Sequence, residues 1–160
     1  MAITDSDLVH LRRAVELARE AADGGDGPFG SVLVDAMGVE RFADRNREQS
    51  TGDETRHPEL EIVRWAVLHM TPGQRAASTV YTSGEHCVMC AAAHAWVGLG
   101  RIVYVASAAQ IAEWRAAMGA APSPVVPLPI TAVAPGVQVD GPVDALAAEV
   151  RVLIERHVDR

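Results

Sequence analysis

Residues 78–106 read STVYTSGEHCVMCAAAHAWVGLGRIVYVA, and the order of elements along them indicates the class of fold. Its apolar runs and glycines predict a strand over Ser78–Ser83, a helix over Cys87–Leu99 and a second strand over Arg101–Ala106. Both cysteines of the chain stand at the start of this helix. The stretch therefore carries secondary structure and metal-ligating or redox-active side chains in the same place.

Further elements are predicted on both sides of this stretch. Upstream we expect a helix over Asp7–Ala22, a glycine-rich loop over Asp23–Pro28, a hairpin of strands Gly30–Asp35 and Val39–Ala43, a polar loop over Asn46–Arg56 and a helix over His57–Met70. Downstream we expect a helix over Ala108–Met118, a proline-rich loop or edge over Ala121–Pro129, a final strand over Thr131–Val139 and a helix over Val143–His157. This alternation predicts an α/β fold, a three-layer α/β/α sandwich with a mixed sheet.

The composition is that of one globular domain. The chain has 160 residues, of which 49% are hydrophobic and 22% charged, so we expect a single domain over residues 1–160. No apolar run approaches the roughly 18 residues that cross a bilayer, and the N-terminus is acidic within five residues. The sequence thus argues against a membrane span and a secretory signal, and we expect a cytoplasmic protein.

The charge balance indicates which class of binding partner the chain favours. Fourteen basic residues, all arginine, stand against 21 acidic ones, for a net charge of −7. No stretch gathers four or more arginines, and a net negative chain repels phosphate backbones. The composition therefore argues against a nucleic-acid partner and favours a small uncharged substrate.

Two motifs carry the chemistry: His57-Pro58-Glu59 and Cys87-x-x-Cys90, each at the start of a predicted helix. Cysteines three residues apart in a first helical turn share one face, so both sulfurs can reach one ion. His57 can supply a third ligand if the two helices lie side by side. Three protein ligands leave one tetrahedral position open, which is typical of a catalytic Zn²⁺ site. A thioredoxin-like redox pair, and a structural zinc site closed by His86 or His94, are the alternatives.

Glu59 is the expected proton carrier. Two thiolates neutralise the charge of the ion, so a bound water is less acidified than in an all-histidine site and a neighbouring base is needed. Glu59 stands two residues after His57 and is placed for this role.

The paired motifs resemble those of the zinc-dependent cytidine deaminase superfamily, whose signature is His-x-Glu followed by Cys-x-x-Cys. Pro28-Phe29-Gly30, Asn46 and Tyr81-Thr82-Ser83 look like the guanine deaminase and nucleoside deaminase branch, and the resemblance covers Leu8 to Val105. It implies a cytidine deaminase-like fold with a five-stranded sheet, hydrolytic deamination with release of ammonia, and a homodimer. Trp96 is our candidate interface residue.

The resemblance also implies roles for individual residues. His57, Cys87 and Cys90 would bind zinc and Glu59 would move protons. In the substrate pocket, Asn46 would hydrogen-bond the base and Phe29 would line it.

The chain departs from the family pattern in two places. Pro58 replaces the usual alanine, and His86 replaces the usual proline before the first cysteine. Guanine deaminases often bind the purine with a downstream acidic residue, for which Glu113 is the nearest candidate here. Trp114, beside it, is a further candidate substrate-binding residue.

We therefore expect a zinc-dependent deaminase of a free nucleobase or nucleoside, with guanine-like purines as the preferred substrate class. The alternatives are a tRNA adenosine deaminase, a cytosine- or triazine-type base deaminase, and a zinc-stabilised interaction module without catalysis.

Overall fold

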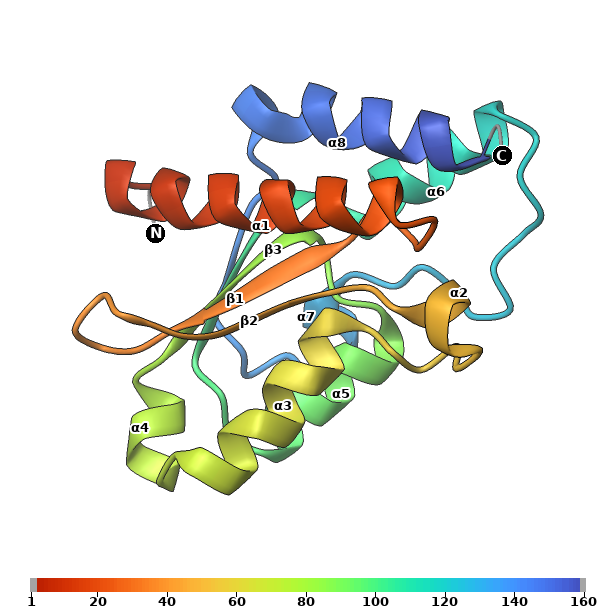
Figure 1. Cartoon of the computed structure of the whole chain (residues 1–160). Helices are drawn as coiled ribbons and strands as arrows, with labels where there is room; N and C mark the ends of the chain where they lie inside the picture. Colours follow the sequence, from red (N-terminus) through yellow and green to blue (C-terminus); the bar gives the residue numbers. More distant parts are fainter. Residues whose placement is uncertain (1–2, 159–160) are drawn as a thin grey trace.

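The fold is built on a five-stranded sheet with helices on both faces (Figure 1). The computed structural model describes residues 3–158. Its elements in chain order are α1 (Asp5–Asp23), β1 (Gly30–Val34), β2 (Glu40–Arg45), α2 (Glu48–Thr51), α3 (Pro58–His69), α4 (Pro72–Ala76), β3 (Thr79–Gly84), α5 (Val88–Trp96), β4 (Arg101–Ala106), α6 (Ala108–Ala117), α7 (Ile130–Val133), β5 (Val139–Asp140) and α8 (Asp144–Val158).

The strands lie in the order β2-β1-β3-β4-β5. β1 runs antiparallel to β2 and to β3, whereas β4 runs parallel to β3 and to β5. The predicted hairpin and the predicted mixed sheet are therefore confirmed. Because β3 and β4 are parallel, their last residues, Gly84 and Ala106, are paired at one edge of the sheet. α5 and α6 begin just beyond this edge, so the predicted chemistry gathers there.

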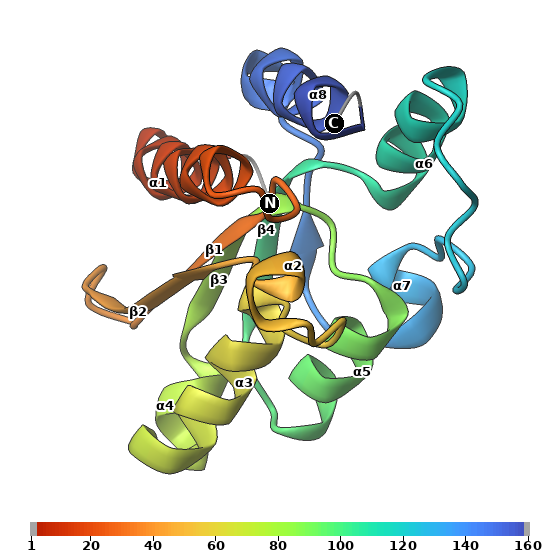
Figure 2. The same ribbon diagram turned by 45° about the vertical axis from the view of Figure 1, so that its right-hand side comes forward.

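Two helical layers enclose the sheet, as the rotated view makes clear (Figure 2). α1 and α8 cover one face, and α3 and α5 cover the other (Figure 1). The core under α1 and α8 includes Leu11, Val15, Val32, Tyr81, Val103, Leu146, Val150 and Ile154. The core under α3 is made of Leu33, Ile62, Val63, Ala66, Val80 and Leu99. The predicted three-layer α/β/α sandwich is confirmed.

α1 shows how the sequence fixes one of these layers. Thr4 caps it: its hydroxyl accepts from the backbone N–H of Asp7, whose carboxylate accepts in return from the Thr4 N–H. A Cβ at Gly30 would lie 2.4 Å from the carbonyl oxygen of Ala14, so only glycine lets α1 pack this closely on β1. Across the described part of the chain, no helix combines the length and the apolar character needed to cross a membrane.

One predicted element is wrong. The strand expected over Thr131–Val139 is replaced by the helical turn α7, and only Val139–Asp140 pairs with β4. Pro135 and Gly136 follow α7 and interrupt the apolar run, so no strand passes through them. Ile130, the first residue of α7, is fully buried although it pairs with no strand. The proline-rich segment before α7 is a loop, as predicted.

Candidate active site

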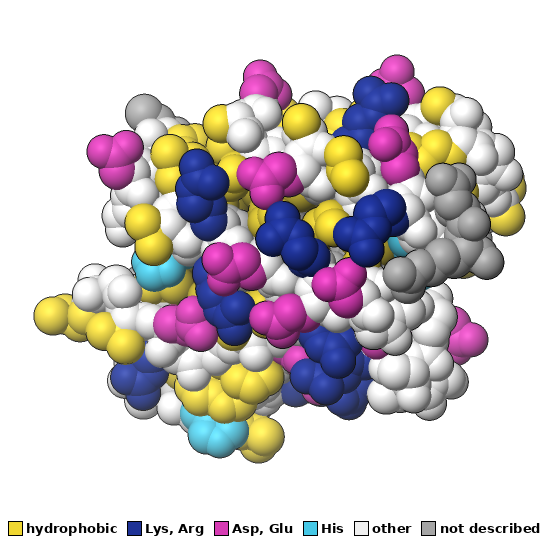
Figure 3. All heavy atoms as spheres, turned by 45° about the horizontal axis from the view of Figure 1, so that its top comes forward, with side chains coloured by type: hydrophobic (Ala, Val, Ile, Leu, Met, Phe, Trp, Pro, Cys, Tyr) yellow, Lys and Arg dark blue, Asp and Glu magenta, His cyan; other side chains and the backbone are white. Residues whose placement is uncertain are grey.

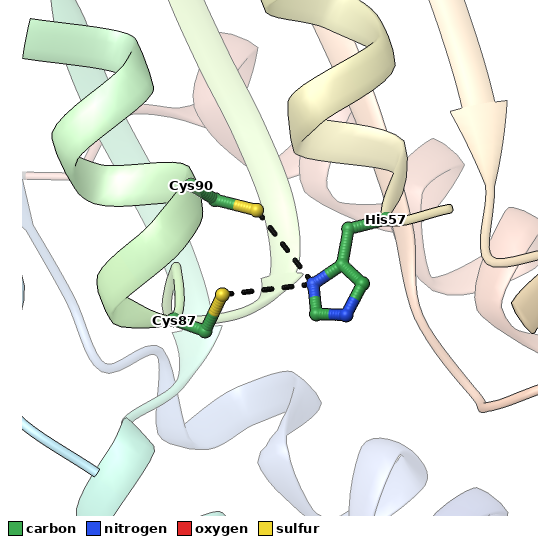
Figure 4. A group of neighbouring side chains, drawn as sticks. All are labelled: His57, Cys87 and Cys90. Carbon is green, nitrogen blue, oxygen red and sulfur yellow. Dashed lines mark hydrogen bonds between the residues drawn. The ribbon is translucent and has the colours of Figure 1, made fainter. Parts of the chain in front are cut away.

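Three side chains converge at the edge of the sheet where β3 ends. His57 is the residue that precedes α3, Cys87 precedes α5, and Cys90 lies in the first turn of α5. α3 and α5 pack side by side, which was the condition for His57 to join the cysteines. Figure 4 shows both sulfurs directed at the same ring nitrogen, His57 Nδ1, at 3.6 Å each.

This spacing fits a zinc ion. A tetrahedral Zn²⁺ with Zn–S about 2.3 Å and Zn–N about 2.0–2.1 Å separates nitrogen from sulfur by about 3.6 Å. The distances from His57 Nδ1 to Cys87 Sγ and to Cys90 Sγ have this value. The three ligand atoms all lie within 4.8 Å of one another. His57, Cys87 and Cys90 are thus placed as zinc ligands, as predicted.

The three side chains perturb one another's pKa values. The hydrogen bond from Cys90 and the neighbouring His57 lower the pKa of Cys87 to about 4, so this group is a thiolate at neutral pH. The same hydrogen bond, together with burial, raises the pKa of Cys90. Burial lowers the pKa of His57, but hydrogen bonds to Cys87 and Glu48 outweigh it and raise the pKa to about 10. The Cys87 thiolate is therefore paired with a protonated His57 ring, and a metal ion would displace that proton on binding.

The alternative of a closed structural site does not fit the geometry. Among the described residues, the cluster contains His57 and the two cysteines but neither His86 nor His94. His94 Nε2 lies 2.8 Å from the carbonyl oxygen of Gly100. His86 is buried with its ring edge against His94, and within residues 3–158 neither of its ring nitrogens has a hydrogen-bond partner. Burial lowers its pKa well below 6.5, so the ring is neutral.

Glu59 lies beside the cluster but is not part of it. Its side chain is buried in α3, and burial raises its pKa. Its Oε1 accepts hydrogen bonds from Ser31 Oγ on β1 and from Thr82 Oγ1 on β3, each at 2.9 Å. A buried carboxylate with a raised pKa and two fixed donors is suited to accept and return a proton.

Phe29 and Asn46 also lie at this edge of the sheet. The backbone N–H of Asn46 donates to the carbonyl oxygen of Phe29 at 2.9 Å, and its buried side chain accepts from the N–H of Glu48 at 3.0 Å. The Phe29 ring faces Gly84, where a Cβ would lie 3.1 Å from Phe29 Cε1 and 2.9 Å from Ile111 Cδ1. The structure thus brings Phe29 and Ile111 together at Gly84, the last residue of β3, which lies three residues before Cys87 in the sequence.

The two downstream candidates lie on α6. Glu113 is exposed, and Trp114 packs against the core under α8 with the guanidinium carbon of Arg151 6.0 Å from its ring centre. These contacts direct Trp114 toward α8, so the structure does not bring it to the three ligands. The proposed contact between Glu113 and the substrate stays a prediction.

Sequence reasoning missed Ser31, Glu48 and Ile111, and it named Thr82 only as part of the family resemblance, without its contact to Glu59. Ser31 and Thr82 left a detectable signal, because each is a polar residue in a strand whose interior is buried. Glu48 left none, since its partner His57 is nine residues away across a loop.

The chain resembles known deaminases. A family model described as the cytidine and deoxycytidylate deaminase zinc-binding region matches residues 4–106. A probable cytosine deaminase from Schizosaccharomyces pombe is 33% identical over 102 residues, which are 64% of this chain and 61% of that protein. Guanine deaminase from Bacillus subtilis is 35% identical over 104 residues, 64% of this chain and 66% of that protein. The chain thus matches less than two thirds of the length of either relative.

Two further comparisons concern the fold and the range of relatives. The structure of guanine deaminase from Nitrosomonas europaea superposes with a TM-score of 0.75 at 20% identity, covering 100% of this chain and 87% of that one, and so shares the fold. A tRNA-specific adenosine deaminase from Agrobacterium fabrum is 33% identical over 95 residues, 59% of this chain and 61% of that protein.

Proposed function

Because the chain belongs to the cytidine and deoxycytidylate deaminase zinc-binding family, we propose that it hydrolytically deaminates a free nucleobase or nucleoside, with guanine-like purines first. The observation that carries the proposal is the tetrahedral spacing of His57, Cys87 and Cys90 with the buried carboxylate of Glu59 beside them. A purely structural site would have no use for that carboxylate, because burying it is costly.

Each residue has a distinct role in this proposal. Zinc, held by His57, Cys87 and Cys90, would supply a water that is acidified and oriented for attack. Glu59 takes the proton from this water and delivers it to the ring nitrogen of the base. It then moves the second proton to the departing amine, so that water and substrate become the carbonyl product and ammonia. The two described hydroxyl contacts of Glu59 are both to Oε1, and we assign proton transfer to Oε2.

Phe29 and Asn46, the proposed substrate contacts, favour a flat, uncharged ligand. Phe29 offers an aromatic wall at the end of β3, and Asn46 offers an amide that fixes the orientation of a base. On α1 and α8, Arg19 and Arg156 each pair with a neighbouring carboxylate. The face of the molecule drawn in Figure 3 likewise shows basic side chains interspersed with acidic ones. With a net charge of −7, this distribution supports a free base over a tRNA.

We also propose that the enzyme is a homodimer. Trp96, at the end of the helix that carries both cysteines, is 90% exposed. A large aromatic side chain this exposed is suited to an interface with a second copy.

The test is a substrate panel with ammonia release as the readout. Guanine, other aminopurines, cytosine, triazines, the matching nucleosides and a tRNA with an anticodon adenosine are offered to zinc-loaded protein at equal enzyme concentration. We expect turnover of guanine or a related base and none of tRNA. Conversion of tRNA alone would establish the tRNA adenosine deaminase alternative, and turnover of cytosine or a triazine alone would establish the second alternative. Zinc binding with no turnover of any substrate would favour the interaction module.

A further inference from the structure

The short helix α2 places a carboxylate behind the histidine ligand. Glu48 begins α2, and its Oε1 lies 2.6 Å from Nε2 of His57. We propose that Glu48 is a positioning residue that fixes the His57 ring for zinc and strengthens Nδ1 as a ligand. The inference rests on the zinc site of the proposed function.

An imidazole offers two nitrogens, and both are engaged here. Nδ1 of His57 faces the two sulfurs, so it must be unprotonated to bind a cation. The proton of the neutral ring then belongs on Nε2, where only an acceptor can satisfy it. Glu48 is such an acceptor, and its negative charge raises the basicity of the ligating nitrogen. The contact thereby selects both the tautomer and the orientation of the ring.

α2 is held in place by contacts that do not involve the Glu48 side chain. The Asp26 carboxylate, fully buried, accepts from the backbone N–H of Ser50 at 2.8 Å and pairs with Arg45 at 3.3 Å. Gln49 Oε1 accepts from the N–H of Gly27 at 3.2 Å. Because these contacts anchor α2 to the loop before β1, Glu48 is presented to His57 by a fixed support. Replacing its side chain should leave α2 folded.

The same helix links the metal end of the site to the base end. The side chain of Asn46 accepts from the backbone N–H of Glu48 at 3.0 Å. The residue proposed to bind the base, Asn46, is thus hydrogen-bonded directly to Glu48, the residue proposed to orient His57. Displacement of α2 would disturb both.

The experiment measures zinc affinity of the full chain by competition with a chromophoric chelator, with turnover recorded separately at saturating zinc. Wild type is compared with Glu48→Ala, Glu48→Gln and the control Glu54→Gln, which removes an exposed carboxylate from the same loop. We expect Glu48→Ala to weaken zinc binding about 10- to 100-fold, the usual effect of losing an outer-shell partner. Glu48→Gln, whose amide oxygen can still accept the Nε2–H, should restore part of the loss. Glu54→Gln should bind zinc as wild type does.

The outcomes separate this inference from the proposed function. Wild-type zinc affinity in Glu48→Ala, or zinc binding that does not involve His57, would overturn the inference even if the protein deaminates a base. Weakened zinc binding in Glu48→Ala supports it even if every substrate in the panel is refused. A thermal melt of each variant, taken in the zinc-free state, shows whether the loss of affinity reflects loss of fold. Equal loss of zinc in the alanine and glutamine variants, with both melting far below wild type, would assign Glu48 a structural role and also overturn the inference.

Discussion

Replacing Glu59 with glutamine should stop turnover while leaving the metal and the fold in place. The amide oxygen of the substituted side chain can still accept from the hydroxyls of Ser31 and Thr82, which lie 2.9 Å from Glu59 Oε1. Since burying an amide costs less free energy than burying a carboxylate, the variant should be at least as stable as wild type. What is lost is the ability to carry a proton, a contribution of about 10²–10⁴-fold in rate, or about 3–5 kcal/mol.

Two comparison variants make the magnitude decisive. Ser31→Ala removes one donor to the carboxylate but keeps the proton carrier. Because a hydrogen bond to a charged group is worth about 1.5–3 kcal/mol, turnover should fall less in Ser31→Ala than in Glu59→Gln. Glu61→Gln, on the same helix and paired with Arg56, should retain wild-type turnover.

The assay combines ammonia release with zinc content and melting temperature for each variant. A Glu59→Gln enzyme within tenfold of wild-type turnover would refute the assignment of Glu59 as the proton carrier. Loss of zinc in step with activity would make Glu59 a ligand instead.

Four further outcomes are expected. Cys90→Ala should lose zinc and melt at a lower temperature, because metal binding and folding are coupled; metal analysis and calorimetry check this. Burial raises the pKa of Asp7, but hydrogen bonds led by Arg101 outweigh it and lower the pKa from 3.8 to about 2, so the stability this group adds is complete above pH about 4 and is lost as pH falls toward 2. In Asp7→Asn, the free energy of unfolding, measured with urea, should therefore fall by about 2 kcal/mol less than in wild type between pH about 4 and pH about 2. Asn46→Ala should lower kcat/KM for the best base by about 1–3 kcal/mol, since it leaves a polar group of the base unpaired; unchanged kinetics would remove Asn46 from the pocket. Light scattering at micromolar concentration should give a dimer mass, and Trp96→Ser should shift it toward a monomer; an active wild-type monomer contradicts this.

The parts of the fold that the sequence predicted are those with a repeated local signal. α1 and α8 show apolar residues at three- and four-residue steps. β1 and β4 contain apolar runs, and β3 is a short stretch of β-branched and aromatic residues that ends at a glycine. The metal cluster was predictable for the same reason, because residue type and spacing together restrict the ligands. Hydrophobic periodicity repeats within a few residues, so a short stretch of sequence is enough to reveal it.

The elements that were missed have no such signal. α2 and α4 span four and five residues, too few to show a helical period, and their stability comes from caps and tertiary contacts. Thr71 caps α4, whereas α2 depends on Asp26, 24 residues before Ser50. The ion pair between Glu48 and His57 depends on where α2 lies, so it too follows from tertiary contacts.

The position of Glu59 depends on the register of the sheet. Ser31 on β1 and Thr82 on β3 are paired across the antiparallel ladder, and both hydroxyls point to the α3 face, where Leu33 and Val80 pack. Their strand neighbours face α1, because side chains alternate between the two faces. A shift of one residue would carry the hydroxyl of Ser31 or Thr82 away from Glu59, and in one direction it would bring Val32 or Tyr81 out of the core under α1 to the α3 face. The pairing that buries the core on both faces of the sheet is therefore the same pairing that presents two donors to the proposed proton carrier.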